Sequence, residues 1–520
     1  MSRSLTIAAS LFLVTLSVSP LNAALAAPVR TASGLVSGLA GADPSVTAFK
    51  GIPFAAPPTG DLRWRAPKPP VAWQETRKAE QFSDSCIQKI VPERKPWTTE
   101  FMAHNQISED CLYLNVWTAA KAAADKRPVL VWFHGGGYNE GSTAVPVYDG
   151  EELARKGLVV VTVNYRLGLI GYLAHPELSK ESGHNASGNY GTLDQIAALH
   201  WVRQNIAAFG GDPGRVTIAG QSAGASSVHN MTASPLAKGL FHRAIAESGS
   251  AVVANNRVAG IREAEQAGLR FAASKGAQSI QQLRAMSWKD LSDLSGSPTS
   301  GFRPVVDGWV LPESLADTFA HGTQNDVPTL TGMTADEGSS AKDYGTIPAT
   351  EFEAQVQKRF GDLAREFLKL YPATADQSQK TSAREQGMVS MYLWAVNRAK
   401  TAKTKAFTYY WNHAEPGPDQ ARYGAFHTSE VPYVFNTLKQ SNRPWTPLDH
   451  KLAEVVGAYW VNFVTTADPN GKDLAPWPAF DPKSAVTMEI GDKTAPRPVA
   501  DQARIAFFAR YFTRPDATAR

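Results

Sequence analysis

The pentapeptide Gly-Gln-Ser-Ala-Gly at residues 220–224 says most about how this chain folds. It follows the segment 215–219, whose β-branched residues are typical of a strand, and precedes small residues that can begin a helix. A strand, a sharp turn and a helix form a nucleophile elbow, in which flanking glycines make room for a strained serine above the sheet edge. We therefore expect Ser222 to be a nucleophile, and a glycine-rich turn without chemistry is the alternative.

The segments around this pentapeptide alternate between strand-like and helix-like patterns. Short β-branched runs predict strands at 129–133, 158–163, 215–219, 242–246, 327–331 and 406–411. Apolar side chains recur every three or four positions between residues 191 and 210, which indicates a helix, and a second helix is expected at 452–464. This alternation predicts an α/β fold, and nothing in the chain has the composition of a linker between domains.

A second glycine-rich segment, His-Gly-Gly-Gly at residues 134–137, comes directly after the expected strand 129–133. Successive glycines let backbone N–H groups approach an incoming carbonyl oxygen closely. We expect the N–H groups of Gly136, Gly137 and Ala223 to form an oxyanion hole, in which one donor contributes roughly 3 kcal/mol. A plain flexible loop is the alternative.

Three further motifs, taken in chain order, resemble those of one enzyme family. They are Phe-Lys-Gly-Ile-Pro-Phe-Ala at 49–55, Ser-Glu-Asp-Cys-Leu-Tyr-Leu-Asn at 108–115 and Phe-Gly-Gly-Asp-Pro at 209–213. With the pentapeptide they make the chain similar, nearly from end to end, to the type-B carboxylesterase family, which also contains the cholinesterases. The resemblance implies an α/β-hydrolase fold, with a large, mostly parallel central sheet flanked by helices and a small N-terminal antiparallel sheet.

The resemblance also implies a catalytic triad in the order serine, acid, histidine. The acid is expected in Ala-Asp-Glu-Gly at 335–338 and the histidine in Gly-Ala-Phe-His at 424–427. Residue types alone do not separate Asp336 from Glu337, nor do they single out one of the eleven histidines. The resemblance favours Glu337 and His427.

Five residues outside the triad also have expected roles. Cys86 and Cys111 are the only cysteines, and an even pair in an exported chain predicts one disulfide, which is also the pairing in the family. The loop between them forms part of a gorge wall in relatives, where Trp97 and Phe101 would line the entrance, and a purely structural role is the alternative. Ser248 matches a serine that supports the acid in relatives, with a structural hydroxyl as the alternative.

The N-terminus has the pattern of a secretory signal peptide. Arg3 precedes an uncharged apolar run, and Ala24 and Ala26 form an A-x-A cleavage pattern. The run is too short to span a membrane, which takes about 20 residues. We expect a signal peptide at 1–26, a single α/β-hydrolase domain at 27–520, and a secreted or periplasmic location.

Composition argues against several other classes of protein. With 43% hydrophobic and 19% charged residues, the chain is an ordinary soluble globular protein rather than a disordered one. Loss of residues 1–26, which hold Arg3 and no acid, lowers the net charge from +4 to +3 and gives no reason to expect nucleic-acid binding or membrane insertion. Two isolated thiols give no metal site, Asp-Pro-Asn-Gly at 468–471 lacks the closing glutamate of a calcium loop, and no cofactor is expected.

These features predict a secreted serine esterase that hydrolyses small-molecule carboxylic esters through an acyl-enzyme. The alternatives are a catalytically inactive, cholinesterase-like binding protein, or a lipase, amidase or thioesterase with the same site. The segments 144–150 and 173–176 are similar to bacterial carboxylesterases that include a fumonisin-hydrolysing enzyme, so a polycarboxylic ester hydrolase is a further alternative. Gln221 is neutral where many relatives have glutamate, so no preference for cationic esters is expected.

Overall fold

The computed structural model describes residues 25, 28–249, 258–292, 301–375 and 377–514. Of the expected signal peptide at 1–26, only Leu25 belongs to this part of the chain, so the expected cleavage site lies outside the described residues.

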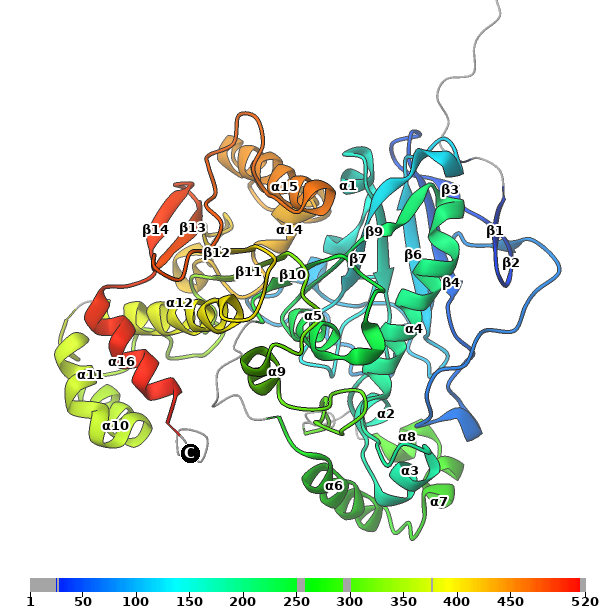
Figure 1. Ribbon diagram of the computed structural model, residues 1–520, viewed down its shortest axis with the longest axis horizontal. Helices are drawn as coiled ribbons and strands as arrows, with labels where there is room; N and C mark the ends of the chain where they lie inside the picture. Colours follow the sequence, from blue (N-terminus) through cyan, green and yellow to red (C-terminus); the bar gives the residue numbers. More distant parts are fainter. Residues whose placement is uncertain (1–24, 26–27, 250–257, 293–300, 376, 515–520) are drawn as a thin grey trace, which may run out of the picture.

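One large sheet of eleven strands runs through the molecule (Figure 1). In spatial order the strands are β14 (Ala495–Pro498), β13 (Val486–Gly491), β12 (Ala406–Asn412), β11 (Thr329–Thr334), β10 (Arg243–Glu247), β9 (Gly211–Gln221), β7 (Arg127–Phe133), β8 (Val159–Val163), β6 (Tyr113–Thr118), β4 (Thr47–Pro53) and β3 (Leu39–Ala40). Neighbours pair in parallel from β13 to β8, and in antiparallel at both edges. The expected large, mostly parallel sheet is confirmed.

A small N-terminal sheet lies beside the large one. It consists of β1 (Val29–Thr31), β2 (Gly34–Ser37) and β5 (Arg77–Lys78). The first two strands pair in antiparallel, as expected for this sheet, and β5 adds a short parallel pair with β2.

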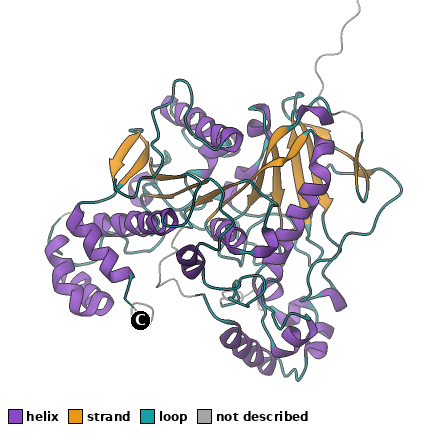
Figure 2. Cartoon of the chain, in the orientation of Figure 1, coloured by secondary structure: helices purple, strands orange, loops and turns teal. Residues whose placement is uncertain are grey.

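Helices cover both faces of the large sheet (Figure 2). They are α1 (Glu151–Arg155), α2 (Gly168–Tyr172), α3 (Pro176–Glu181), α4 (Tyr190–Asn205), α5 (Ala223–Ala233), α6 (Ile261–Ser274), α7 (Ile280–Ala285), α8 (Trp288–Leu291), α9 (Leu315–His321), α10 (Ala349–Phe360), α11 (Ala364–Leu370), α12 (Ser378–Ala399), α13 (Gln420–Tyr423), α14 (Val431–Val434), α15 (Pro447–Thr466) and α16 (Gln502–Phe512).

The two faces of the sheet bury two separate cores, as is visible along β7. Leu130 and Trp132 contribute to one hydrophobic cluster, which α1 and α15 cover. Val129, Val131 and Phe133 contribute to the other, which α4 and α5 cover. A strand turns successive side chains to opposite faces, and parallel strands buried on both sides therefore read as continuous apolar runs.

The boundaries of some elements differ from the sequence expectation for local reasons. The helix expected from 191 to 210 ends as α4 at Asn205, and a 3₁₀ turn then leads to Gly210 in the left-handed region, with φ 78°. The strand expected at 327–331 is β11, which runs on to Thr334. Gly332 lets it continue, because a Cβ there would lie 2.1 Å from the Tyr409 ring of the neighbouring strand.

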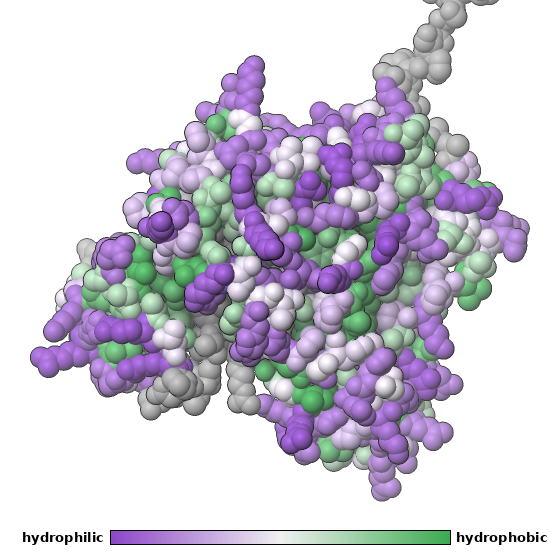
Figure 3. Space-filling model, in the orientation of Figure 1, coloured by the Kyte–Doolittle hydropathy of each residue, from purple (hydrophilic) through white to green (hydrophobic). Residues whose placement is uncertain are grey.

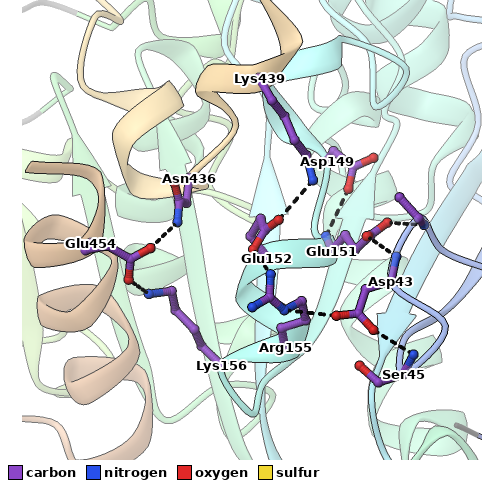
Figure 4. A network of polar contacts seen from close by, with 11 residues as sticks. Asp43, Ser45, Asp149, Glu151, Glu152, Arg155, Lys156, Asn436, Lys439 and Glu454 are labelled. Atoms are coloured by element: carbon purple, nitrogen blue, oxygen red, sulfur yellow. Dashed lines mark hydrogen bonds and ion pairs between the residues drawn. The ribbon is translucent and has the colours of Figure 1, made fainter. Parts of the chain in front are cut away.

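A network of polar contacts joins the loop between β3 and β4, α1 and the C-terminal part of the chain (Figure 4). Glu151 accepts hydrogen bonds from two backbone N–H groups of the loop before β4, including that of Asp43 at 2.8 Å. Asp43 pairs with Arg155 at 3.2 Å, and Glu152 pairs with Lys439 at 2.9 Å. The network therefore holds α1 between segments that lie far apart in the sequence.

The surface viewed in Figure 3 is mostly hydrophilic, with apolar side chains in scattered patches. Among the helices of the described residues, none combines the length and the apolar character needed to cross a membrane.

Candidate active site

Ser222 occupies the sharp turn between β9 and α5. Its backbone has φ 59° and ψ −123°, a strained conformation for a residue with a side chain. A Cβ on Gly224 would lie 1.9 Å from the carbonyl oxygen of Phe133, and a Cβ on Gly220 would lie 2.6 Å from the Gly224 backbone. The turn therefore requires glycine at both flanking positions, as the pentapeptide indicated.

Glu337 and His427 meet beside this turn, from loops that follow β11 and α13. The Nδ1 atom of His427 forms a hydrogen bond with Oε2 of Glu337. The other carboxylate oxygen of Glu337 accepts a hydrogen bond from the backbone N–H of Thr334 at 2.8 Å. The acid is thus fixed by the strand end on one side and by the imidazole on the other.

Asp336, the other candidate acid, takes a different position. Its carboxylate contacts the Arg384 guanidinium at 2.7 Å and the Tyr344 hydroxyl at 3.0 Å. It also accepts a hydrogen bond from the N–H of Ala425 at 3.1 Å, while its own N–H donates to the Ala425 carbonyl at 2.9 Å. Asp336 therefore joins the acid loop to the histidine loop and does not reach the imidazole.

The charges of Glu337 and His427 stabilise each other. Burial favours the neutral form of each group, but the His427 charge and its hydrogen bond outweigh burial and lower the pKa of Glu337. In the same way the Glu337 carboxylate outweighs burial and raises the pKa of His427 above its usual value. The pair is suited to an imidazole that gains a proton during a reaction.

Gln221 lies against the same imidazole. Its side-chain nitrogen is 3.2 Å from Nε2 and 3.5 Å from Nδ1 of His427, so it approaches both ring nitrogens rather than lying in line with one. Among the hydrogen bonds of the described residues, none joins Ser222 Oγ to His427, although both side chains line one cavity. Catalytic hydrogen bonds are often long before substrate binds.

The glycine loop lies across from the serine and bends sharply. Gly136 and Gly137 have φ of 101° and 61°, and a Cβ on Gly136 would lie 2.0 Å from the Glu140 carbonyl oxygen. Ala223 is the first residue of α5. In the hydrogen bonds found for the described residues, the N–H groups of Gly136, Gly137 and Ala223 have no acceptor. They are available as donors, and the N-terminus of α5 adds partial positive charge.

Ser222, His427 and the glycine loop line a cavity of about 780 Å³. Cys86 and Cys111 form a disulfide, which confirms the expected pairing. The segment between them supplies much of one wall of the cavity, including Trp97 and Phe101. Trp97 also donates a hydrogen bond from Nε1 to the His427 carbonyl at 2.9 Å. It therefore both lines the cavity and holds the histidine loop.

Ser248 directly follows β10. Its hydroxyl donates a hydrogen bond to Oε1 of Glu430 at 3.3 Å, and its side chain also helps to lower the pKa of Glu337. Sequence reasoning did not identify Glu430, Glu247 or Arg384 as residues close to the catalytic groups. A signal existed for Glu247, because a carboxylate that ends an apolar β-strand run is unusual.

No group of three or more His, Cys, Asp or Glu side chains is arranged to hold a metal ion anywhere in the described ranges.

The chain is similar to known esterases in both sequence and structure. The profile of the family described as "Carboxylesterase family" matches residues 26–508. A fumonisin B1 esterase from Sphingopyxis macrogoltabida is 38% identical over 483 residues, which covers 89% of this chain and 86% of that protein. A para-nitrobenzyl esterase from Bacillus subtilis is 32% identical over 489 residues, which covers 88% and 94%. A solved structure of a PNB esterase superposes with a TM-score of 0.78 at 29% identity, and the match covers 93% of this chain and 99% of that one.

Proposed function

This chain belongs to the carboxylesterase family and is a carboxylic ester hydrolase, and we propose that it works through a Ser222-His427-Glu337 triad and an acyl-enzyme. The observation that carries the proposal is that His427, which is paired with Glu337, lines one cavity together with Ser222. The strained serine supplies the nucleophile, and the pair supplies a base whose charged form is stabilised.

In the proposed acylation step, Nε2 of His427 accepts the Ser222 hydroxyl proton while Oγ attacks the ester carbonyl carbon. The carbonyl oxygen becomes an oxyanion that accepts hydrogen bonds from the N–H groups of Gly136, Gly137 and Ala223. When the tetrahedral intermediate collapses, His427 gives its proton to the alcohol oxygen, the C–O bond breaks, and the acyl group stays on Ser222.

In the proposed deacylation step, His427 removes a proton from water and the hydroxide attacks the acyl-enzyme. The proton then returns to Ser222 Oγ, the acid is released, and the free enzyme is restored. Glu337 holds the tautomer in which Nδ1 carries a proton and stabilises the imidazolium. No step needs a metal ion or an organic cofactor.

The acyl-enzyme can be tested directly with a p-nitrophenyl ester under rapid mixing. If deacylation is slower than acylation, one equivalent of p-nitrophenolate appears in a burst before steady turnover. The mass of the quenched protein should rise by the acyl group on a peptide that contains Ser222. Acyl transfer to another residue would overturn the proposed nucleophile, and absence of any ester turnover would favour a binding protein.

A polycarboxylic ester is a second candidate substrate, because Lys89 lines the cavity in addition to the Arg94–Glu140 ion pair, and the fumonisin B1 esterase is similar to this chain. Cations at a cavity wall favour an anionic substrate. The candidate predicts that kcat/KM for an ester with a carboxylate-bearing acyl group exceeds that for its neutral methyl-esterified analogue. The ratio should fall as salt is raised.

We also propose that residues 1–26 are a signal peptide, that 27–520 form one domain, and that the protein is secreted or periplasmic. The proposal is supported by the apolar run in the sequence, the disulfide, and a single sheet whose strands extend from Leu39 to Pro498. N-terminal sequencing of exported protein should begin at Ala27. An uncleaved chain in the cytoplasmic fraction would contradict export.

A further inference from the structure

An ion pair joins two of the segments that line the cavity. Arg94 belongs to the segment between the two cysteines and Glu140 to the glycine loop, and both residues line the cavity. The Arg94 guanidinium donates hydrogen bonds to both carboxylate oxygens of Glu140, the longer of them at 3.4 Å. The proposed mechanism gives neither side chain a role.

The backbone of Glu140 helps to orient one of the expected oxyanion donors. The carbonyl oxygen of Gly136 accepts hydrogen bonds from the N–H groups of Asn139 and Glu140, each at 3.0 Å. That carbonyl belongs to the same planar peptide unit as the N–H of Gly137, and in a trans peptide unit the two groups point in opposite directions. A displacement of Glu140 would therefore turn the N–H of Gly137.

The glycine loop has little room to absorb such a displacement. A Cβ on Gly136 would lie 2.0 Å from the carbonyl oxygen of Glu140, and a Cβ on Gly135 would lie 3.1 Å from the Cβ of Ser222. The loop is thus packed against its own turn on one side and against the expected nucleophile on the other. Close packing of this kind transmits movement rather than damping it.

Arg94 is held in turn by Trp97. Its guanidinium carbon lies 5.2 Å from the centre of the Trp97 ring, and its backbone N–H donates to the Trp97 carbonyl at 2.9 Å. Trp97 donates from Nε1 to the His427 carbonyl at 2.9 Å, and its ring meets the imidazole edge to face with 6.4 Å between the ring centres. The contacts therefore run from the histidine loop through Trp97 and Arg94 to Glu140.

We propose that Arg94 and Glu140 are positioning residues that hold the glycine loop in place relative to the histidine loop. Their contact keeps the N–H of Gly137 directed at the oxyanion while His427 transfers protons. This proposal rests on the proposed triad and oxyanion hole, since it concerns how the two are kept in their relative positions. It applies to any ester, neutral or charged.

The ion pair acts on position rather than on stability. The side chains of Arg94 and Glu140 are 49% and 26% exposed, and exposed ion pairs contribute little to the free energy of unfolding. Loss of an oxyanion donor lowers kcat roughly 100-fold or more, and a displaced donor costs less than a lost one. We expect loss of the pair to lower kcat about fivefold, because acylation and deacylation both pass through an oxyanion, and to change the melting temperature by less than about 2 °C.

Arg94→Met and Glu140→Gln remove the ion pair and nearly keep the size of each side chain. With a neutral p-nitrophenyl ester, we expect each variant to lower kcat about fivefold and to change KM less than about twofold. The double variant should lose no more than either single variant, because both changes remove the same contact. Arg94→Lys should recover most of the rate, since lysine can still pair with Glu140.

Lys95→Met and Asp419→Asn are the matched controls. Lys95 is the next residue of the same segment and pairs with Asp419 at 2.8 Å, with side chains 46% and 48% exposed. Neither residue is among those that line the cavity. These variants remove an equally exposed ion pair from the same segment and should keep kcat within about twofold of wild type.

A trifluoromethyl ketone gives a readout that a partial loss of folded protein would not move. Ser222 Oγ adds to its carbonyl carbon, the hydroxyl proton passes to His427, and the carbonyl oxygen becomes an oxyanion in the expected hole. The inhibition constant should rise about fivefold in Arg94→Met and Glu140→Gln, together with the loss of kcat/KM. It should stay within about twofold of wild type in the controls.

If the Arg94 and Glu140 variants do not fold, the salt dependence of wild type decides. Salt screens an exposed ion pair, so kcat for the neutral ester should fall about twofold between about 0.05 and 0.5 M sodium chloride. The fall should persist in Lys95→Met, which lacks only the other pair. A kcat that does not change with salt would then refute the proposal.

Three outcomes with folded variants would also overturn it. They are an unchanged kcat in Arg94→Met, an equal loss of kcat in Lys95→Met, and a rise in KM with kcat unchanged, which would make Arg94 a substrate-binding residue. Failure of the proposed function would look different, because wild type itself would then show neither the p-nitrophenolate burst nor inhibition by the trifluoromethyl ketone.

Discussion

Asp336 is bound by Arg384 of α12 through hydrogen bonds at 2.7 and 3.0 Å to its two carboxylate oxygens, directly beside the residue that contacts the histidine. Two adjacent acids therefore have separate roles. Asp336 connects loops, and Glu337 faces His427.

We expect Glu337→Gln to lower kcat far more than Asp336→Asn does. The amide removes the charge that stabilises the imidazolium, and in a Ser-His-Asp triad the comparable change lowers kcat about 10⁴-fold. Asp336→Asn should mainly lower the melting temperature, because it leaves the half-buried Arg384 without its partner. Steady-state kinetics and thermal unfolding of both variants check this, and the reverse ranking in kcat would give the triad role to Asp336.

Ser222→Ala should reduce turnover of a simple ester to less than about a hundredth of the wild-type rate, with the fold unchanged. The nucleophile is lost, while the packing around a small side chain hardly alters. Ser226→Ala, one helical turn along α5, is a suitable control and should stay active. Retained activity in Ser222→Ala would mean that another group attacks the ester.

The pH dependence of kcat/KM should show a rising limb above the ordinary histidine value of about 6.5. The Glu337 carboxylate raises the pKa of His427, and the imidazole must be neutral to accept the serine proton, so activity appears as pH rises through that higher value. In Glu337→Gln the limb should move to lower pH, because the stabilising charge is gone. A rate that stays flat from pH 5 to 8, with chemistry rate-limiting, would contradict the role of His427.

Reduction of the Cys86–Cys111 disulfide should destabilise the protein by about 3.5 kcal/mol in the chain-entropy model, given a sequence separation of 25 residues. Because the enclosed segment supplies a cavity wall and not the triad, KM should rise more than kcat falls. Cys86→Ala/Cys111→Ala compared with wild type under oxidising conditions measures both effects. Two free thiols in oxidised, exported protein would rule out the bond.

Gln221 is 1% exposed and places a neutral amide against the imidazole, where a glutamate would add charge. We expect wild type to favour butyrylcholine over its uncharged 3,3-dimethylbutyl analogue by less than tenfold in kcat/KM, which corresponds to about 1.4 kcal/mol. Gln221→Glu should increase that preference and raise the pKa of His427, because a nearby negative charge favours both cations. A larger preference in wild type would require an anionic or aromatic site elsewhere in the cavity.

The sequence predicted the parts of this molecule that depend on local patterns. The pentapeptide at 220–224 requires its glycines for steric reasons that any similar turn would share, and β7, β8 and β9 stand out as apolar runs. The sequence could not show whether Asp336 or Glu337 is the acid of the triad. That choice depends on Arg384, which lies 48 residues after Asp336 on a helix that bears no motif. The contact of Gln221 with His427, 206 residues apart, likewise exists only in the folded chain.

The segment between Cys86 and Cys111 is a wall anchored at both ends, and this has a consequence for how selectivity can change. Its contacts with the residues around the cavity include two that hold its backbone in place: Gln88 pairs through both amide atoms with the backbone of Gly141 at 2.8 Å, and Trp97 donates to the His427 carbonyl. Within the segment, the side chains of Lys89, Val91 and Met102 line the cavity, and none of these residues belongs to a strand of the main sheet. A library that varies Lys89, Val91 and Met102 and keeps Gln88 and Trp97 can therefore change which esters the enzyme prefers, while the residues that carry out hydrolysis stay in place.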